Sequence, residues 1–449
     1  MVSKDSLLTL LRQCNKCQKG QRNLSFRMEG LAFAVSGECT SCEHPFSWGN
    51  STVLRTAKGS SRERLPKKNV DVVTGAVITS IGGTKLHQVM LMSGITPLFQ
   101  STFHIIKKFY VFPAVTEVFW KAQAAVIEAL RARIAKGERV QLSGDGSFDS
   151  RGHSGAWCRY FFIDAKTGEV IHYTLMHKSH TGSSGTTEVA ALEQGLRELS
   201  YMIGGTEAIE CLVTDRHPAV TKMMRTKFPE IGHFYDPWHF FRNITMTLLE
   251  LCKPIYMAPV RFWIKIIINR CYDAVITSNG DGELASEKFR AILLCMTDQH
   301  AFDKDRSFKK LKACSHSTPK NKTIFIPVGG RIQKRLEDKV FTDKNIDDIK
   351  SVSPLLQTSC CESVNAVAWR YAPNDLYFTR PGHELRTRLT VLHWNHLKET
   401  AANGTRPVKK SYTNPTHKRV VWRNVRKTAS HTWRTEIKDL TYKVQLNMI

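Results

Sequence analysis

Alternation of apolar and polar positions predicts five strands in the middle of the chain, between residues 139 and 236. The predicted strands are 139–145 (RVQLSGD), 157–164 (WCRYFFID), 170–177 (VIHYTLMH), 209–215 (IECLVTD) and 232–236 (GHFYD). Short turns join the first three, which indicates an antiparallel meander. Helix-period spacing over 187–196, over 218–227 and from Trp238 onward predicts a helix after the third, the fourth and the fifth strand.

This order of elements predicts an α/β fold with an RNase H-like core, a mixed five-stranded sheet in which parallel strands extend a meander through helical crossovers. Ligands of such open sheets collect at strand ends, where side chains leave the packed layer. Asp145 ends the first predicted strand and Asp215 ends the fourth, so we expect their carboxylates to lie side by side. The alternatives are that Asp145 is a turn residue beside glycine and that Asp215 caps a helix.

A third acid is expected from a helix after these strands, and Glu362 in TSCCESVNAVAWRYAP has the apolar spacing for one. It follows Asp215 by 147 residues, too long for a loop, so residues 241–355 are predicted to form a mainly helical inserted domain. Three carboxylates can hold two Mg²⁺ (or Mn²⁺) ions about 3.5–4 Å apart, the arrangement that cuts and joins phosphodiesters. By itself, Glu362 would be an ordinary helical glutamate.

Asp236 and His239 follow the fifth predicted strand in the sequence DPWH. They could support the acids by orienting a phosphate or a catalytic group. The alternative is a helix start with Asp236 as N-cap and Pro237 at the first position. Both interpretations can hold together.

Paired cysteines predict a zinc ribbon over residues 1–54, with Cys14-x2-Cys17 and Cys39-x2-Cys42 as ligands of a structural Zn²⁺. The ion would supply folding energy that so small a unit lacks. The alternative is four reduced, unliganded thiols. The other eight cysteines show no second ligand set with convincing spacing, Cys314-Ser315-His316 being a weak pattern, and most are expected to be small buried hydrophobes.

Residues 55–137 are interpreted as a polar, basic linker followed by a helical DNA-binding region. A helix over 85–92, a glycine turn and a second helix from Ser101 have the layout of a helix-turn-helix, although any pair of packed helices gives this pattern. Lys107 and Lys108 on the second helix are candidates for DNA contact.

Charge points to the same partner. The chain has 65 Lys and Arg against 40 acids, a formal net charge of +25, which favours a polyanion and above all nucleic acid. Residues 401–449 form a basic tail with eleven Lys or Arg and two acids, in which Arg423, Arg426 and Lys427 are candidates for contact with DNA phosphates. No apolar run reaches spanning length and no signal peptide is recognised, so we expect an intracellular protein without a membrane partner.

Four motifs resemble eukaryotic cut-and-paste DDE transposases of the Mutator-like and Kolobok-like groups, over roughly residues 10–400: GDGSFDSRGHSG, VTDRHPAV, YDPWH and TSCCESVNAVAWRYAPNDLYF. The resemblance implies that Asp145, Asp215 and Glu362 are the metal-binding catalytic trio, with the core divided between 138–240 and 356–400. A (C/D)-x2-H signature of these enzymes falls on Asp236 and His239. Phe148 stands where a tryptophan is common.

The resemblance also implies a function, which is Mg²⁺-dependent strand cleavage at the terminal inverted repeats of a transposon and strand transfer to target DNA. Double-stranded DNA would be the partner, the nucleus the location, and a homo-oligomer the state on DNA. The alternative is a domesticated, non-catalytic DNA-binding protein, and a simple metal-dependent nuclease comes third. The three differ in outcome: binding only, cutting only, or cutting followed by joining.

Overall fold

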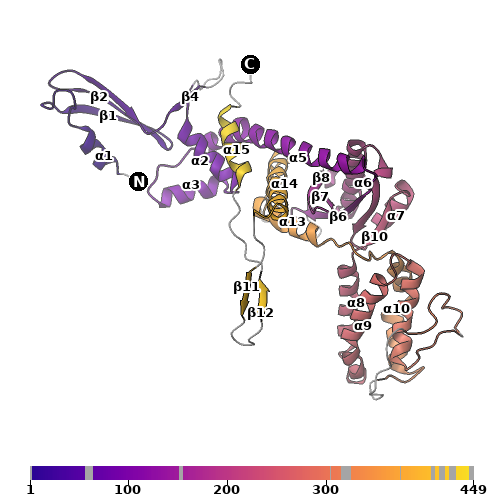
Figure 1. Cartoon of the computed structure of the whole chain (residues 1–449). Helices are drawn as coiled ribbons and strands as arrows, with labels where there is room; N and C mark the ends of the chain where they lie inside the picture. The colour runs from indigo at the N-terminus through magenta and orange to yellow at the C-terminus, as the bar shows by residue number, and fades with distance from the viewer. Residues whose placement is uncertain are drawn as a thin grey trace. The chain divides into compact units, whose positions relative to one another are not determined.

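The computed structural model describes the following residues: 3–55, 64–150, 155–303, 305–314, 325–374, 376–405, 410–413, 420–423 and 431–443. The chain forms two compact units, one of residues 1–125 with 367–449 and one of residues 126–366 (Figure 1). No helix among the described residues combines the length and the apolar character needed to cross a membrane.

The second unit is built on a mixed five-stranded sheet, with the strand order β10-β9-β6-β7-β8. Its strands are β6 (Val140–Phe148), β7 (Trp157–Asp164), β8 (Val170–His177), β9 (Ile209–Thr214) and β10 (Gly232–Tyr235). Strands β6, β7 and β8 form the antiparallel meander, whereas β9 pairs parallel with both β6 and β10. The mixed sheet expected from the sequence is confirmed.

Helix α6 (Ser184–Ile203) follows β8 and packs against β7 and β8. A capping box between Ser183 and Thr186 starts it, and Gly204 ends it in the left-handed conformation, with a φ of 98°. Gly195 allows the close approach, because a Cβ there would lie 2.1 Å from the Phe162 ring. Helix α7 (Pro218–Lys227) connects β9 to β10, and Val220 and Met224 from it join the same buried core.

A helical segment with its own core fills much of residues 237–348. It contains α8 (Pro237–Leu251), α9 (Ala258–Ile276), α10 (Gly282–Met296), α11 (Arg331–Lys339) and α12 (Asp343–Asp348). Helix α9 packs against both α8 and α10, as Figure 1 shows. Between α10 and α11 the described residues form no helix or named strand.

The first unit begins with helix α1 (Lys4–Leu11) and a three-stranded antiparallel sheet of β1 (Arg22–Glu29), β2 (Ala32–Cys39) and β3 (Pro45–Gly49). A hairpin of β4 (Val53–Arg55) and β5 (Arg64–Pro66) follows, where the sequence predicts a flexible linker. The part of that linker over 56–63 lies outside the described residues.

The helical part of the first unit differs from the prediction in three places. Helix α2 (Lys67–Ile78) was not predicted. The expected second helix is α4 (Gln100–Ile106), which continues through a π-helical turn (Lys107–Val111) into α5 (Phe112–Ile134), whereas α3 (Gly83–Met92) is close to its prediction. The C-terminal stretch interpreted as a tail contains a packed helix, α15 (Thr432–Lys443).

The remaining elements are α13 (Ser359–Tyr371), α14 (Arg380–Ala402), β11 (Lys410–Thr413) and β12 (Val420–Arg423). Helix α15 packs against α2, with Trp433 and Ile437 buried. The Tyr442 hydroxyl accepts a hydrogen bond from Lys67 Nζ (3.0 Å) and donates one to Asp71. These contacts make α15 part of the folded unit.

Candidate active site

Asp145, Asp215 and Glu362 all belong to the second unit. Asp145 lies in β6 and Asp215 directly follows β9. Ser143 pairs with Val213 in parallel register, so the same register two residues further on sets Asp145 beside Asp215. The Asp145 residue is half-buried, whereas the side chain of Asp215 is 50% exposed.

Glu362 reaches this edge of the sheet on α13, in whose first turn it lies. Val352 pairs parallel with Tyr235, the last residue of β10, and Ser143 Oγ donates to the Gln357 carbonyl at 3.1 Å. These two contacts bring the chain to the start of α13. The structure therefore brings together three acids that are far apart in sequence.

His239 lies between Asp215 and Glu362. Its Nδ1 is 3.1 Å from Asp215 Oδ1, and its Nε2 is 3.1 Å from Glu362 Oε1. Each carboxylate therefore faces one nitrogen of a single ring. Since an imidazole bridging two acids fixes both in orientation, His239 is well placed to organise the acidic cluster.

Asp236 caps helix α8 and also connects it to α13. It is 2% exposed, and its Oδ1 accepts a hydrogen bond from the His239 backbone N–H at 2.8 Å. Its Oδ2 accepts from the Thr358 backbone N–H at 2.6 Å and from Thr358 Oγ1 at 2.9 Å. Because Thr358 directly precedes α13, this carboxylate ties the start of the Glu362 helix to the start of the His239 helix.

Asn365 is a neighbour of the acids that the sequence analysis missed. Its Nδ2 donates to Asp145 Oδ2 at 2.7 Å, and its Oδ1 is buried without a hydrogen-bond partner among the described residues. Asn365 follows Glu362 by three residues on α13, so both side chains lie on one face. The Glu-x2-Asn spacing was the signal that could have revealed it.

Glu188, in the second turn of α6, is a fourth carboxylate that the sequence analysis missed. Burial first, and then the charge of Asp215, raises its pKa to about 7. It packs against β6 at Gly146, where a Cβ would lie 2.9 Å from Glu188 Cγ. The signal was an acid at the start of the helix that follows the third strand, beside the glycine of the Asp-Gly pair.

Electrostatics at this edge of the sheet favour a cation. Burial first, and then the charges of Asp215, Glu188 and Glu362, raise the pKa of Asp145 to about 8. Burial likewise raises the pKa of Asp215, with Asp236 and Glu362 acting in the same direction and His239 opposing them. Carboxylates that resist ionisation in each other's company form a hard oxygen ligand set for divalent ions.

The carboxylate oxygens of the site do not converge closely enough to enclose a single metal ion. Within the described ranges, the groups of three or more ligands whose atoms all lie within 4.8 Å of one another are two clusters made of cysteine and histidine. The acids are therefore spread more widely than the ligands of one enclosed ion. Such spacing fits ions that water and a phosphate group help to hold.

Cys14, Cys17, Cys39 and Cys42 form one of these clusters. The Cys14–Cys42 and Cys17–Cys39 sulfur pairs are 3.8 and 3.6 Å apart, close to the roughly 3.8 Å expected for thiolates on a tetrahedral zinc ion. Hydrogen bonds to its sulfur, that of the Cys17 backbone N–H first, lower the pKa of Cys14 to about 6, which favours the thiolate. The predicted cluster therefore forms and fits zinc.

The candidate DNA-contacting residues lie in the first unit, whereas the acids belong to the second. Lys107 is half-buried, and burial together with the charge of Arg386 lowers its pKa. Lys108 is exposed. Arg423 ends β12, and Arg426 and Lys427 lie outside the described residues.

Comparison with protein families gives a match for residues 2–185, to the family described as Mutator-like transposase. The matched segment includes the four clustered cysteines, Asp145 and the first three strands of the sheet, and it ends before Asp215 and Glu362. The search of the curated proteins gives no match.

Proposed function

Since residues 2–185 match the family described as Mutator-like transposase, we propose that the chain is a DDE transposase with an RNase H-like core, of the eukaryotic cut-and-paste kind. It cleaves DNA strands at the terminal inverted repeats of a transposon and transfers the freed ends to target DNA. The observation that carries the proposal is that His239 lies 3.1 Å from both Asp215 and Glu362, at the sheet edge where Asp145 also lies.

We assign Asp145, Asp215 and Glu362 as the ligands of two Mg²⁺ ions, or of Mn²⁺ in their place. Glu188 is a further carboxylate within reach of the same charge cluster. The fit rests on the donor set, which is rich in carboxylate oxygens, on the raised pKa values, and on the buried Asn365 Oδ1 without a partner among the described residues. When bound, the ions activate a nucleophilic oxygen and stabilise the leaving one.

The chain's own residues have positioning tasks. Asn365 holds one oxygen of Asp145 through its hydrogen bond and leaves the other to face the site. Asp236 fixes the first turns of α8 and α13 relative to each other, which sets His239 and Glu362 in place. In the absence of a cation, His239 bridges the carboxylates of Asp215 and Glu362. Its ring can also donate a proton to the leaving-group oxygen of a phosphodiester bound next to these acids.

The rest of the chain serves DNA binding in this proposal. A zinc ribbon over residues 1–54 and a helical region over 55–137 contact double-stranded DNA, helped by the basic stretch over 401–449. The core is divided between 138–240 and 356–400, around an inserted domain over 241–355. A transposase brings two element ends together, so we propose a homo-oligomer on DNA, in the nucleus.

A strand-cleavage and strand-transfer assay tests the proposal. The substrate is a labelled duplex carrying the inverted repeat that flanks the coding region, with a plasmid as target and with or without Mg²⁺. Asp145→Asn should abolish cleavage and joining while binding remains. Glu250→Gln is a matched control, because Glu250 is exposed on α8 and pairs only with Lys253 among the contacts described for it.

The outcomes separate the alternatives. Cleavage followed by joining supports the transposase. Binding without cleavage by the wild type identifies a domesticated DNA-binding protein, and cleavage without joining identifies a nuclease. Mg²⁺-dependent cleavage that survives in Asp145→Asn would contradict the assignment of the acids.

A further inference from the structure

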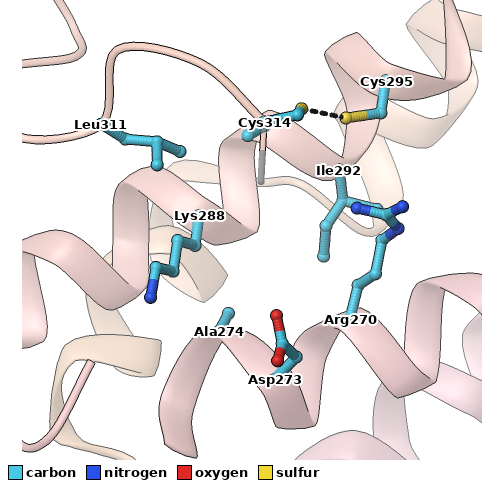
Figure 2. Close-up of a pocket in the computed structure, with 9 residues that line it drawn as sticks. Arg270, Asp273, Ala274, Lys288, Ile292, Cys295, Leu311 and Cys314 are labelled. Atoms are coloured by element: carbon cyan, nitrogen blue, oxygen red, sulfur yellow. Dashed lines mark hydrogen bonds between the residues drawn. The ribbon is translucent and has the colours of Figure 1, made fainter. Parts of the chain in front are cut away.

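A second cluster of metal-ligand side chains lies in the helical part of the second unit, outside the acidic site. Cys295, His300 and Cys314 each bring one ligand atom to within 4.8 Å of the others. The sulfur atoms of Cys295 and Cys314 are 2.8 Å apart. Figure 2 shows these two side chains pointing toward one another, Cys295 from helix α10 and Cys314 from the loop that follows it.

The backbone brings these residues together. Helix α10 ends at Met296, and Asp298 takes the left-handed conformation, with a φ of 61°, to reverse the chain. Ala301 then pairs antiparallel with Ala313. The Cys314 N–H donates to the His300 carbonyl at 3.0 Å, so two of the ligands are directly paired across a short hairpin.

The part of the segment between α10 and α11 nearest the cluster has a small apolar core, in which Phe302 and Phe308 pack with Ala291 and Cys295 of α10. Further along, Ile326 joins the larger core of the helices. The buried Glu287 carboxylate accepts the backbone N–H groups of residues 309, 310 and 311 at 2.7–2.9 Å. Described residues that form no helix or named strand and share so small a core are typical of regions that a metal stabilises.

We propose that Cys295, His300 and Cys314 bind a structural zinc ion, distinct from that of the N-terminal cysteines. Two thiolates and an imidazole are a zinc ligand set, and water or one further side chain would complete the tetrahedron. Asp298 Oδ1 lies 3.3 Å from His300 Nε2, where it orients the ring as carboxylates do beside metal-bound histidines.

A disulfide between the same cysteines is the competing arrangement. The sulfurs would have to separate by roughly 1 Å to share a tetrahedral ion, or approach by roughly 0.8 Å to form a disulfide. Metal binding is favoured because it also accounts for the third ligand, whereas a disulfide makes no use of His300. Zinc loading would fix the loop to the end of α10, whether or not the acidic site is active.

Zinc content of the purified full-length chain, measured by plasma mass spectrometry, tests the proposal. The wild type should carry two zinc ions, one for each cluster. Cys314→Ser and Cys42→Ser should each lose one, and the double variant should lose both. Cys252→Ser is the control, because Cys252 is buried in α8's C-terminal cap outside both clusters and should leave the content unchanged.

His300→Gln is a milder variant, and circular dichroism identifies any chain that fails to fold. This variant should weaken zinc retention against a chelator at least tenfold while its helix content stays that of the wild type. A wild type with one zinc ion, or zinc content unchanged by Cys314→Ser, would overturn the proposal. So would an intact-mass deficit, reversed by a reductant, that maps to a Cys295–Cys314 bond.

Discussion

Replacing Thr358 by valine tests how Asp236 positions the helix that carries Glu362. Thr358 is 2% exposed, and its hydroxyl donates to Asp236 Oδ2 at 2.9 Å. Valine keeps the shape of the side chain and removes only the hydroxyl. The backbone N–H of residue 358 still donates to the same oxygen, so the change isolates one hydrogen bond to a buried carboxylate.

The expected cost follows from that geometry. A hydrogen bond to a charged group contributes about 1.5–3 kcal/mol, and no water can replace the hydroxyl at a buried position. We therefore expect Thr358→Val to lower the free energy of unfolding of the second unit by about 2 kcal/mol, close to a thirtyfold change in the unfolding equilibrium. Thr358→Ser keeps the hydroxyl and loses a methyl group, so it should cost about 1 kcal/mol or less.

Hydrogen exchange measured by mass spectrometry follows this change in the peptides of α13 and of the start of α8, without assuming that the two units unfold together. Exchange there should accelerate in Thr358→Val, and DNA cleavage should slow with it because Glu362 is held less firmly. Thr358→Ser should behave nearly as the wild type. Equal exchange in Thr358→Val and the wild type, or equal acceleration in the valine and serine variants, would refute the reasoning.

Three further predictions concern the same unit. Burial lowers the pKa of His233 from 6.5 to about 4, so the unfolded chain takes up the proton at a higher pH than the folded chain does. The neutral histidine therefore contributes up to about 3 kcal/mol of stability above pH 6.5, and this contribution is lost as the pH falls toward 4. In His233→Asn, urea midpoints at pH 7.5 and 5 should therefore differ less than in the wild type, and an unchanged pH slope would exclude this cause. Arg133→Met leaves the Asp164 side chain, which is 1% exposed, without its ion-pair partner. Thermal unfolding should show a loss of about 3–5 kcal/mol of stability, part of which Asp164→Asn restores in the double variant. A loss below about 1 kcal/mol would count against a stabilising role of this ion pair. Glu188→Gln should slow Mg²⁺-dependent cleavage at least tenfold without lowering stability, since it removes a charge that its neighbours disfavour; full activity would exclude Glu188 from the site.

The strands of the sheet could be predicted because their pattern is dictated locally. Strand β7 reads WCRYFFID and β8 reads VIHYTLMH, and both are bounded by turn residues. Their apolar and β-branched side chains, between such turns, leave little competition from helix. The order of strands and helices then limits the topology to few choices.

Helix α2 shows where this reasoning fails. Val70, Val73 and Val77 are buried in it, and β-branched residues weaken a prediction of helix from propensity alone. Their burial within the first unit, which includes the contact of α2 with α15, stabilises the helix. Tertiary packing therefore determines that α2 is helical, and nothing in the sequence of α2 or of α15 indicates that the two helices pack together.

The candidate site was predictable to the extent that its residues end elements. Asp215 follows a strand and Asp236 starts a helix, and both positions can be read from the chain. Asn365 and Glu188 lie within helices, and the sequence signals that mark them are weak, because an asparagine or a glutamate on a helix is ordinary until the sheet shows what it faces. Their contacts with Asp145 and Gly146 depend on how α13 and α6 pack.

Crystals of the chain soaked in Mn²⁺ test the central claim most directly, because anomalous diffraction locates the metal without a DNA substrate. The account predicts Mn²⁺ bound by the carboxylates of Asp145, Asp215 and Glu362, with loss of the signal in Asp145→Asn. Mn²⁺ absent from these carboxylates in the wild type at concentrations that support cleavage, or bound equally in Asp145→Asn, would contradict it.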